Sequence, residues 1–197
     1  MAKVHVTTPL TDAQVKQIKA GDEVYITGTI YTARDAAHKK MVDDLEAGRP
    51  LPFDPRGAII YYTGPTPPKP GQALGSCGPT TSYRMDKYAP TMYDQGVKAS
   101  IGKGYRSDEV KASLVKNTAL YLASTGGAGA LLAKCIVAAE VVAYEDLGAE
   151  AVRKLTVKDL PTVCINDSHS GDQYYTGQIE YVKPDAMAKP KKPEAGE

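Results

Sequence analysis

The sequence EVYITGTI (residues 23–30), followed by TARDAAHKK (residues 32–40), decides the fold class of this chain. β-Branched residues predominate in the first segment, which predicts a strand. Thr32 belongs to the residue types that cap helix N-termini, and Met41 and Leu45 lie on one face of the helix predicted after it. A strand that leads directly into an amphipathic helix is typical of a layered α/β domain.

The same alternation continues on both sides of this stretch. Apolar or β-branched runs predict further strands at 4–8, 58–62, 97–101, 119–123, 160–165 and 174–181. Capping residues and apolar runs predict helices at 11–18, 107–115 and 130–133; a further helix could begin within 81–88, and 136–143 fits either a helix or a strand. Some connections are too short for a crossover between parallel strands. We therefore expect an α/β domain whose sheet mixes parallel and antiparallel pairs.

Length and charge set the broad class of the protein. The 197 residues have room for one domain, which we expect at 1–182, followed by a loose, solvated extension at 183–197. The net charge of +1 creates no global field for nucleic acid or an anionic membrane. No apolar run approaches the roughly 20 residues of a membrane helix, and the N-terminus lacks the apolar stretch of a signal peptide. We therefore expect a cytoplasmic protein.

The three cysteines, Cys77, Cys135 and Cys164, lie far apart in the sequence. An odd number without paired spacing argues against a disulfide framework or a zinc site within the chain. Cys77 precedes Gly78 and Pro79, and two interpretations remain: a small reduced side chain in a turn, which we favour, or a metal or cluster ligand.

Three cations in turns are the main candidates for function. Arg34 lies at the start of the predicted helix, where free N–H groups and the helix dipole favour an anion. Its guanidinium could bind a carboxylate with two hydrogen bonds, or could simply pair with Asp35 or another surface acid. Lys103 lies between Gly102 and Gly104, which would let its ammonium project into a cleft; a solvated lysine in a turn is the alternative.

The segment GPTTSYR (residues 78–84) carries the third cation, Arg84. If residues 80–84 are helical, the Thr80 hydroxyl and the Arg84 guanidinium share a face and can meet one ligand. Alternatively, Thr80 or Thr81 only caps a helix. Together these segments are suited to a small dianion, but nothing near them completes a catalytic site.

Three weaker signals favour structural explanations. His38 could donate a hydrogen bond to a substrate, but a packed or surface histidine is the better interpretation. The sequence GGAG (residues 126–129) could hold an anion, but close helix packing is the commoner use of such small residues. Asp167, His169 and Asp172 could bind a metal, but their position predicts a turn.

Several of these motifs, in this order, resemble the β subunit of two-subunit iron–sulfur hydro-lyases, the class I fumarate hydratases and L(+)-tartrate dehydratases. In single-chain members of the family the same region is the C-terminal domain. The resemblance extends from about Leu10 to Tyr181. The motifs that carry it are GTIYTARDAAHK (28–39), GPTTSYRMD (78–86), GKG (102–104), GGA (126–128) and DLP (159–161).

This resemblance implies a swivelling β/β/α domain and a partner α subunit that carries three cysteines and a [4Fe-4S] cluster, in an assembly of two α and two β subunits (α₂β₂). By family likeness Arg34 and Arg84 hold the substrate carboxylates, Lys103 adds a third positive charge, and Thr80 takes part in moving the proton at carbon. The cysteines of this chain would not bind the cluster.

The activity implied is reversible hydration of fumarate to malate. The alternatives are dehydration of L(+)-tartrate, which the residues of this half-site do not distinguish, and a non-catalytic module that binds a dicarboxylate.

Overall fold

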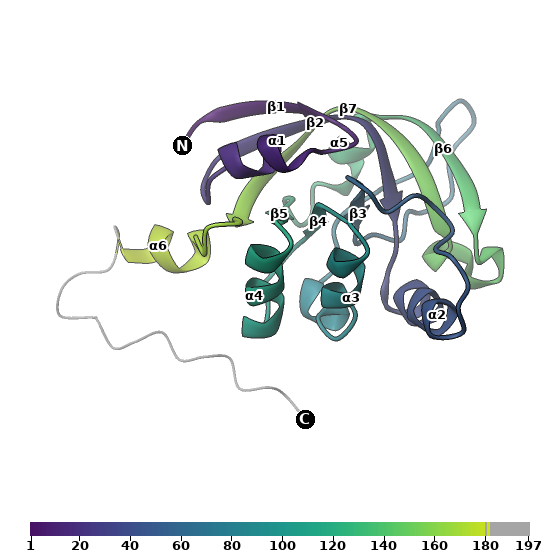
Figure 1. Cartoon of the computed structure of the whole chain (residues 1–197). Helices are drawn as coiled ribbons and strands as arrows, with labels where there is room; N and C mark the ends of the chain where they lie inside the picture. Colours follow the sequence, from purple (N-terminus) through teal and green to yellow (C-terminus); the bar gives the residue numbers. More distant parts are fainter. Residues whose placement is uncertain (180, 182–197) are drawn as a thin grey trace.

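The computed structural model describes residues 1–179 and residue 181, and seven strands within that part form one mixed sheet (Figure 1). The expected extension at 183–197 lies outside the described residues. Along the sheet the strands follow the order β1-β2-β3-β4-β5-β7-β6. Their bounds are β1 (Lys3–Thr7), β2 (Glu23–Thr32), β3 (Ile59–Tyr61), β4 (Ala99–Gly102), β5 (Leu120–Ala123), β6 (Ile136–Ala143) and β7 (Val152–Asn166).

The sheet closes on itself because β7 pairs along both of its edges. The 15 residues of β7 run antiparallel to β2 on one edge, and antiparallel to β6 and then β5 on the other. Strands β2, β3, β4 and β5 pair in parallel. Strands β2, β3, β4, β5 and β7 therefore form a closed mixed barrel, with β1 and β6 as outer strands. The predicted mixture of parallel and antiparallel pairs is confirmed.

Helices cover the sheet and connect its strands. Figure 1 shows α2, α3 and α4 next to one another on the lower side of the strands. The α-helices are α1 (Asp12–Gln17), α2 (Asp35–Glu46), α3 (Ala89–Asp94), α4 (Asp108–Lys116), α5 (Gly129–Ala133) and α6 (Gln173–Ile179). Two 3₁₀ segments are η1 (Ser82–Met85) and η2 (Glu145–Glu150). No helix in the described part of the chain is long and apolar enough to span a bilayer.

Successive residues of each strand enter two different apolar clusters, as the period of two in a strand requires. On β3, Ile59 and Tyr61 belong to a cluster that also contains Val15 of α1. Ile60, between them, belongs instead to a second cluster that contains Met41 of α2. The first cluster fills the barrel and the second joins the sheet to α2, α3 and α4. This double burial explains why β3 reads as a continuous apolar run.

Most predicted elements are found, and the capping residues mark two helix starts correctly. Thr11 accepts a hydrogen bond from the backbone N–H of Gln14, and Ser107 accepts one from Val110. The ambiguous segment 136–143 is the strand β6. The predicted strand 160–165 is only the end of β7, and α3 was not predicted.

Two predictions from local pattern were wrong. Residues 174–181 do not form a strand, since α6 occupies most of this segment; the Asp172 carboxylate accepts from the N–H of Tyr174 and its carbonyl accepts from Thr176, which starts a helix. Thr32 does not cap α2, because it remains in β2 and its hydroxyl bonds the backbone of Ala151 and Arg153 instead. Partners far away in the sequence decide the case of Thr32, whereas local hydrogen bonds from Asp172 decide the case of α6.

Candidate active site

The predicted site residues all lie at one edge of the sheet. Arg34 follows the end of β2, Lys103 follows β4 directly, and Thr80 and Arg84 lie in the long connection that follows β3. Since β2, β3 and β4 are parallel, their carboxyl ends meet at the same edge. The topology therefore gathers segments that are scattered in the sequence.

Arg34 directly precedes the first residue of α2, Asp35. It occupies the N-cap position with an extended backbone and no side-chain cap. Its Nη2 lies 3.1 Å from Oε1 of Glu150 in η2, and its Nε lies 3.9 Å from Oδ1 of Asp35. Gly64 packs against it so closely that a Cβ on Gly64 would lie 3.1 Å from Nη1. Arg34 is thus held by an acid from a distant loop, in addition to its sequence neighbour.

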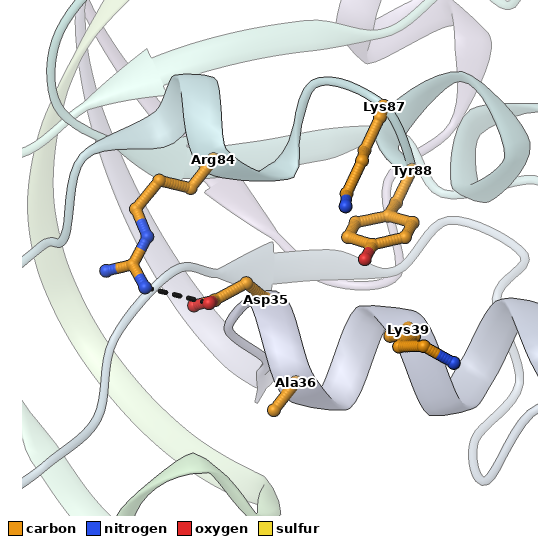
Figure 2. Close-up of a pocket in the computed structure, with 6 residues that line it drawn as sticks. All are labelled: Asp35, Ala36, Lys39, Arg84, Lys87 and Tyr88. Carbon is orange, nitrogen blue, oxygen red and sulfur yellow. Dashed lines mark hydrogen bonds and ion pairs between the residues drawn. The ribbon is translucent and has the colours of Figure 1, made fainter. Parts of the chain in front are cut away.

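Arg84 also contacts the first turn of α2, through Asp35. Its Nη2 donates a 2.8 Å hydrogen bond to Oδ2 of Asp35, and its side chain is 41% exposed. Figure 2 shows this bond beside a pocket of about 360 Å³. The pocket is lined by Asp35, Ala36, Lys39, Arg84, Lys87 and Tyr88. Asp35 therefore lies between the two arginines that the sequence singled out.

Thr80 and Lys103 are neighbours through their backbones, not through a helix. The Thr80 N–H donates to the Tyr62 carbonyl at 2.8 Å, and the Lys103 N–H donates to the Thr80 carbonyl at 3.2 Å. The Ser82 N–H donates to the Lys103 carbonyl at 2.9 Å, and η1 begins only at Ser82. The prediction that Thr80 and Arg84 share a helix face was wrong, because residues 80–81 run extended beside the end of β4.

The alternative interpretation, that Thr80 or Thr81 caps a helix, is correct only for the position of Thr81. Thr81 is the N-cap of η1, but no side-chain cap hydrogen bond forms there. The half-buried Thr80 side chain stands at the sheet edge, and the exposed Lys103 side chain extends toward Gly126. A Cβ on Gly126 would lie 3.5 Å from Cδ of Lys103, an ordinary contact distance.

Gly129, at the end of the glycine-rich stretch after β5, packs closely against a neighbouring backbone. A Cβ on Gly129 would lie 2.9 Å from the backbone nitrogen of Gly78, which no side chain tolerates. The Cys77 N–H donates to the Gly129 carbonyl at 3.0 Å. The packing interpretation is therefore confirmed for Gly129, whose packing fixes the loop that leads to Thr80, but not for Gly127, where a Cβ would meet nothing within 4 Å.

A buried polar network anchors the segment that carries Thr80 and Arg84. Arg106, whose side chain is fully buried, donates from Nε to Oδ1 of Asp86 at 2.6 Å. The other carboxylate oxygen of Asp86 accepts from the Ser107 N–H at 2.6 Å. The hydroxyls of Ser82 and Tyr121 lie 2.9 Å apart. Burial and pairing of this kind rigidify a segment, since any unpaired member would be costly.

Sequence reasoning missed Arg106 and Glu150. A signal for Arg106 was present in the sequence. Asp86 lies within the GPTTSYRMD motif and Arg106 closely follows GKG, so an acid and a base of opposite charge lie at two motifs of the site. Glu150 had no such signal, because it follows an apolar strand in a segment without any motif.

His38 is a packed core residue, as the favoured interpretation predicted. Its ring is fully buried, and Nδ1 donates to the Arg34 carbonyl at 2.8 Å. Burial lowers its pKa to about 4. The ring lies between Tyr62, in an edge contact, and Tyr88, in a stacked one. A neutral His38 therefore supports the start of α2 from beneath.

The cysteine thiols are poorly suited to bind a metal cluster. Burial raises the pKa of Cys77 to about 11, and burial also raises the pKa of Cys135 and Cys164. A cluster ligand must be a thiolate, and several must converge. Among residues 1–179 and 181, no three His, Cys, Asp or Glu side chains are grouped so as to hold a metal ion.

The late acidic segment forms a turn, as its position predicted. Both carboxylate oxygens of Asp167 accept backbone N–H groups, from Ala20, His169 and Gly171. Asp172 pairs with Lys111 at 2.6 Å. These bonds use the carboxylates within the fold.

A family model described as Fumarase C-terminus matches residues 1–177. The chain is 38% identical over 176 residues to Fumarate hydratase 2 of Leishmania major, and 37% identical over 174 residues to the anaerobic class I fumarate hydratase of Escherichia coli. These alignments cover 87% and 86% of this chain, but the chain spans only 31% and 32% of the length of those relatives.

A third relative is a subunit of more similar extent. The putative L(+)-tartrate dehydratase subunit beta of Methanocaldococcus jannaschii is 38% identical over 171 residues. That alignment covers 84% of this chain and 88% of the relative.

Proposed function

The chain belongs to the fumarase C-terminal family, and from this premise we propose that it is the β subunit of an iron–sulfur hydro-lyase that hydrates fumarate reversibly to malate together with an α subunit. The observation that carries the proposal is the gathering of Arg34, Thr80, Arg84 and Lys103 at the carboxyl edge of three parallel strands. A C4 dicarboxylate is a small dianion, and guanidinium and ammonium groups at one edge suit it.

In this proposal the two arginines hold the carboxylates of the substrate. Arg34 and Arg84 each keep N–H groups beyond those bonded to Glu150 and Asp35. Lys103 adds a positive charge beside them. Removal of a proton from the carbon next to a carboxylate pushes negative charge onto that carboxylate, and preorganised cations stabilise it in the transition state. The charges of this chain therefore act on the developing anion.

Thr80 is the proposed group at the reacting carbon. A threonine hydroxyl is a weak base, so it needs neighbouring positive charge to favour its ionised form. Lys103 lies in the segment whose backbone pairs with that of Thr80. The backbone hydrogen bonds of Thr80 to Tyr62 and Lys103 hold Thr80 in position. The same geometry also serves a simpler role, in which the hydroxyl donates a hydrogen bond to a substrate carboxylate.

The iron–sulfur cluster of such an enzyme belongs, in our proposal, to the α subunit. The thiols of this chain do not fit a cluster, because their burial favours the protonated form. We also propose that the complex is an α₂β₂ assembly in the cytoplasm, in which this chain acts as the swivelling β/β/α domain. Sedimentation of the purified complex tests its stoichiometry.

Dehydration of L(+)-tartrate is the second candidate activity. It is favoured by the relative from Methanocaldococcus jannaschii, a putative L(+)-tartrate dehydratase subunit beta of which the alignment covers 88%. Tartrate differs from malate by one hydroxyl, and the side chains of this half-site offer no group that selects for it.

The deciding experiment assays the complex of this chain with an α-type partner against fumarate, malate and both tartrate enantiomers. We expect fumarate and malate to turn over fastest, Arg84→Ala to abolish turnover, and Arg56→Ala, which removes a surface arginine paired with Asp54, to preserve it. Tartrate turnover faster by orders of magnitude would replace fumarate as the substrate. Inactivity of the complex, with tight malate binding by this chain alone, would instead indicate a binding module.

A further inference from the structure

Asp35 faces both arginines of the candidate site, one with each carboxylate oxygen. Its Oδ2 accepts from Nη2 of Arg84 at 2.8 Å, while its Oδ1 faces Nε of Arg34 at 3.9 Å. One carboxylate thus lies between two guanidinium groups that come from different connections of the sheet. Figure 2 shows the Arg84 side chain pointing toward Asp35 in the first turn of α2.

The atoms on the Arg34 side of this contact are buried and have no hydrogen bond. Oδ1 of Asp35 and Nε of Arg34 each lack a partner, and 3.9 Å is too long for a hydrogen bond. A buried polar atom without a partner is costly, so these two atoms gain by moving toward each other.

The charge of Asp35 also matters, because it balances the positive charge of Arg84. Two guanidinium groups at one site repel each other, and the ammonium of Lys103 lies at the same sheet edge. Glu150 offsets Arg34 through Nη2 at 3.1 Å, which leaves Asp35 as the counter-ion of Arg84. Within the described chain, Nη2 is the one Arg84 nitrogen with a hydrogen-bond partner, so Nε and Nη1 remain for a ligand.

We propose that Asp35 is a positioning residue: it holds the Arg84 guanidinium beside Arg34, so that both arginines present their remaining N–H groups to the two ends of one dicarboxylate. This inference rests on the proposed function, because it assigns Asp35 to the same site. Asp35 does not touch the substrate in this arrangement. Its effect passes through Arg84, and its loss weakens binding more than it slows turnover.

The test is Asp35→Asn in the complex with the α subunit. Asparagine keeps the shape and a neutral acceptor for Arg84 but removes the charge. We expect KM for fumarate, and the inhibition constant of the unreactive dicarboxylate succinate, to rise together by about three- to tenfold, with kcat within about twofold of wild type. Asp43→Asn is the matched control, because Asp43 lies on the same helix and pairs with Lys39 at 2.6 Å. It should leave both constants unchanged.

A double-mutant cycle separates positioning through Arg84 from a general structural effect. In an Arg84→Lys background, Asp35→Asn should add little to KM, because a lysine does not reproduce the planar fork that Asp35 orients. Unchanged KM and inhibition constant in Asp35→Asn, or additive effects in the cycle, would overturn the role of Asp35 while leaving the proposed function intact. A wild-type complex without hydro-lyase activity would overturn the proposed function itself.

Discussion

His38 shows how the fold sets the chemistry of a single residue. In the sequence it stands one turn after Arg34, where a histidine could meet a substrate. In the structure its ring is fully buried and its Nδ1 hydrogen bonds to the Arg34 carbonyl. The pKa of about 4 follows from burial, because a charged imidazolium loses its hydration there. The residue thus supports the first turn of α2 as a neutral ring.

The lowered pKa of His38 predicts how stability depends on pH. Between pH 6.5 and 4 the unfolded chain binds a proton at this histidine and the folded chain does not, so stability falls as pH falls through this window. The loss from His38 between pH 7 and pH 4 is about 3 kcal/mol. Urea unfolding at pH 7, 5.5 and 4.5 measures it.

The matching variant is His38→Gln, which keeps a polar side chain but does not titrate. We expect a lower stability at pH 7 and a flatter dependence on pH between 6.5 and 4. Identical slopes in wild type and His38→Gln would exclude His38 as the cause.

At the scale of elements, the segment from Thr80 to η1 depends on its neighbours for its shape. It contains one short 3₁₀ turn, Ser82–Met85, whose N-cap makes no side-chain bond. Its position comes instead from the end of β4 on one side and from the buried Arg106–Asp86 pair on the other. Gly102 of β4 contributes as well, because the hydroxyl of Ser82 lies where a Cβ would be. The site loop is therefore held by tertiary contacts.

Removing Asp86 should release this segment. Asp86→Ala leaves the guanidinium of Arg106 buried without its carboxylate, and breaking one side of such a pair costs about 3–5 kcal/mol. Denaturant unfolding of the variant measures the loss. Asp54→Ala, which breaks a surface pair with Arg56, should change the stability little.

A double replacement identifies the origin of that loss. Asp86→Leu combined with Arg106→Met removes both charges and should recover part of the stability, because no buried charge is left unpaired. If the double variant is as unstable as Asp86→Ala, the loss comes from the packing of η1 and not from the unpaired charge.

At the scale of the whole molecule, β7 turns an open layered sheet into a closed barrel. It pairs with β2, β5 and β6, and so joins the first half of the chain to the last. The same closure places η2, just before β7, beside α2, where Glu150 binds Arg34. The barrel also buries Cys77 and Cys164 within one apolar cluster. Closure of the barrel therefore brings Glu150 to Arg34 and also buries the thiols of Cys77 and Cys164.

Burial of the thiols predicts the behaviour of the isolated chain toward iron and sulfide. The purified chain, reconstituted alone, should develop no iron–sulfur absorbance, whereas its complex with the α subunit should. Cys135→Ser is the informative control, because Cys135 is the least buried thiol, and it should leave the absorbance of the complex unchanged. A stable brown chromophore in the isolated chain would contradict the placement of the cluster in the α subunit.

The sequence alone determined what depends on near neighbours along the chain. The caps at Thr11 and Ser107, the apolar strand at 58–62 and the cationic motifs around Arg34, Arg84 and Lys103 were all found this way, because capping and periodicity act over a few residues. The family resemblance carried by these motifs was confirmed by the match over residues 1–177. The catalytic roles of Thr80 and the three cations stay predictions.

Only the tertiary structure decided what depends on partners far away in the sequence. The helix at Gln173–Ile179, the full length of β7, the extended backbone at Thr80 and the acids Glu150 and Asp86 beside the site were not predicted. Apart from the helix, whose first hydrogen bonds come from the nearby Asp172, each depends on hydrogen bonds or ion pairs with residues far away in the sequence. Local pattern contains no information about which acid will meet which arginine. Glu150 meets Arg34 across the pairing of β7 with β2, and Asp86 meets Arg106 between the connections that follow β3 and β4.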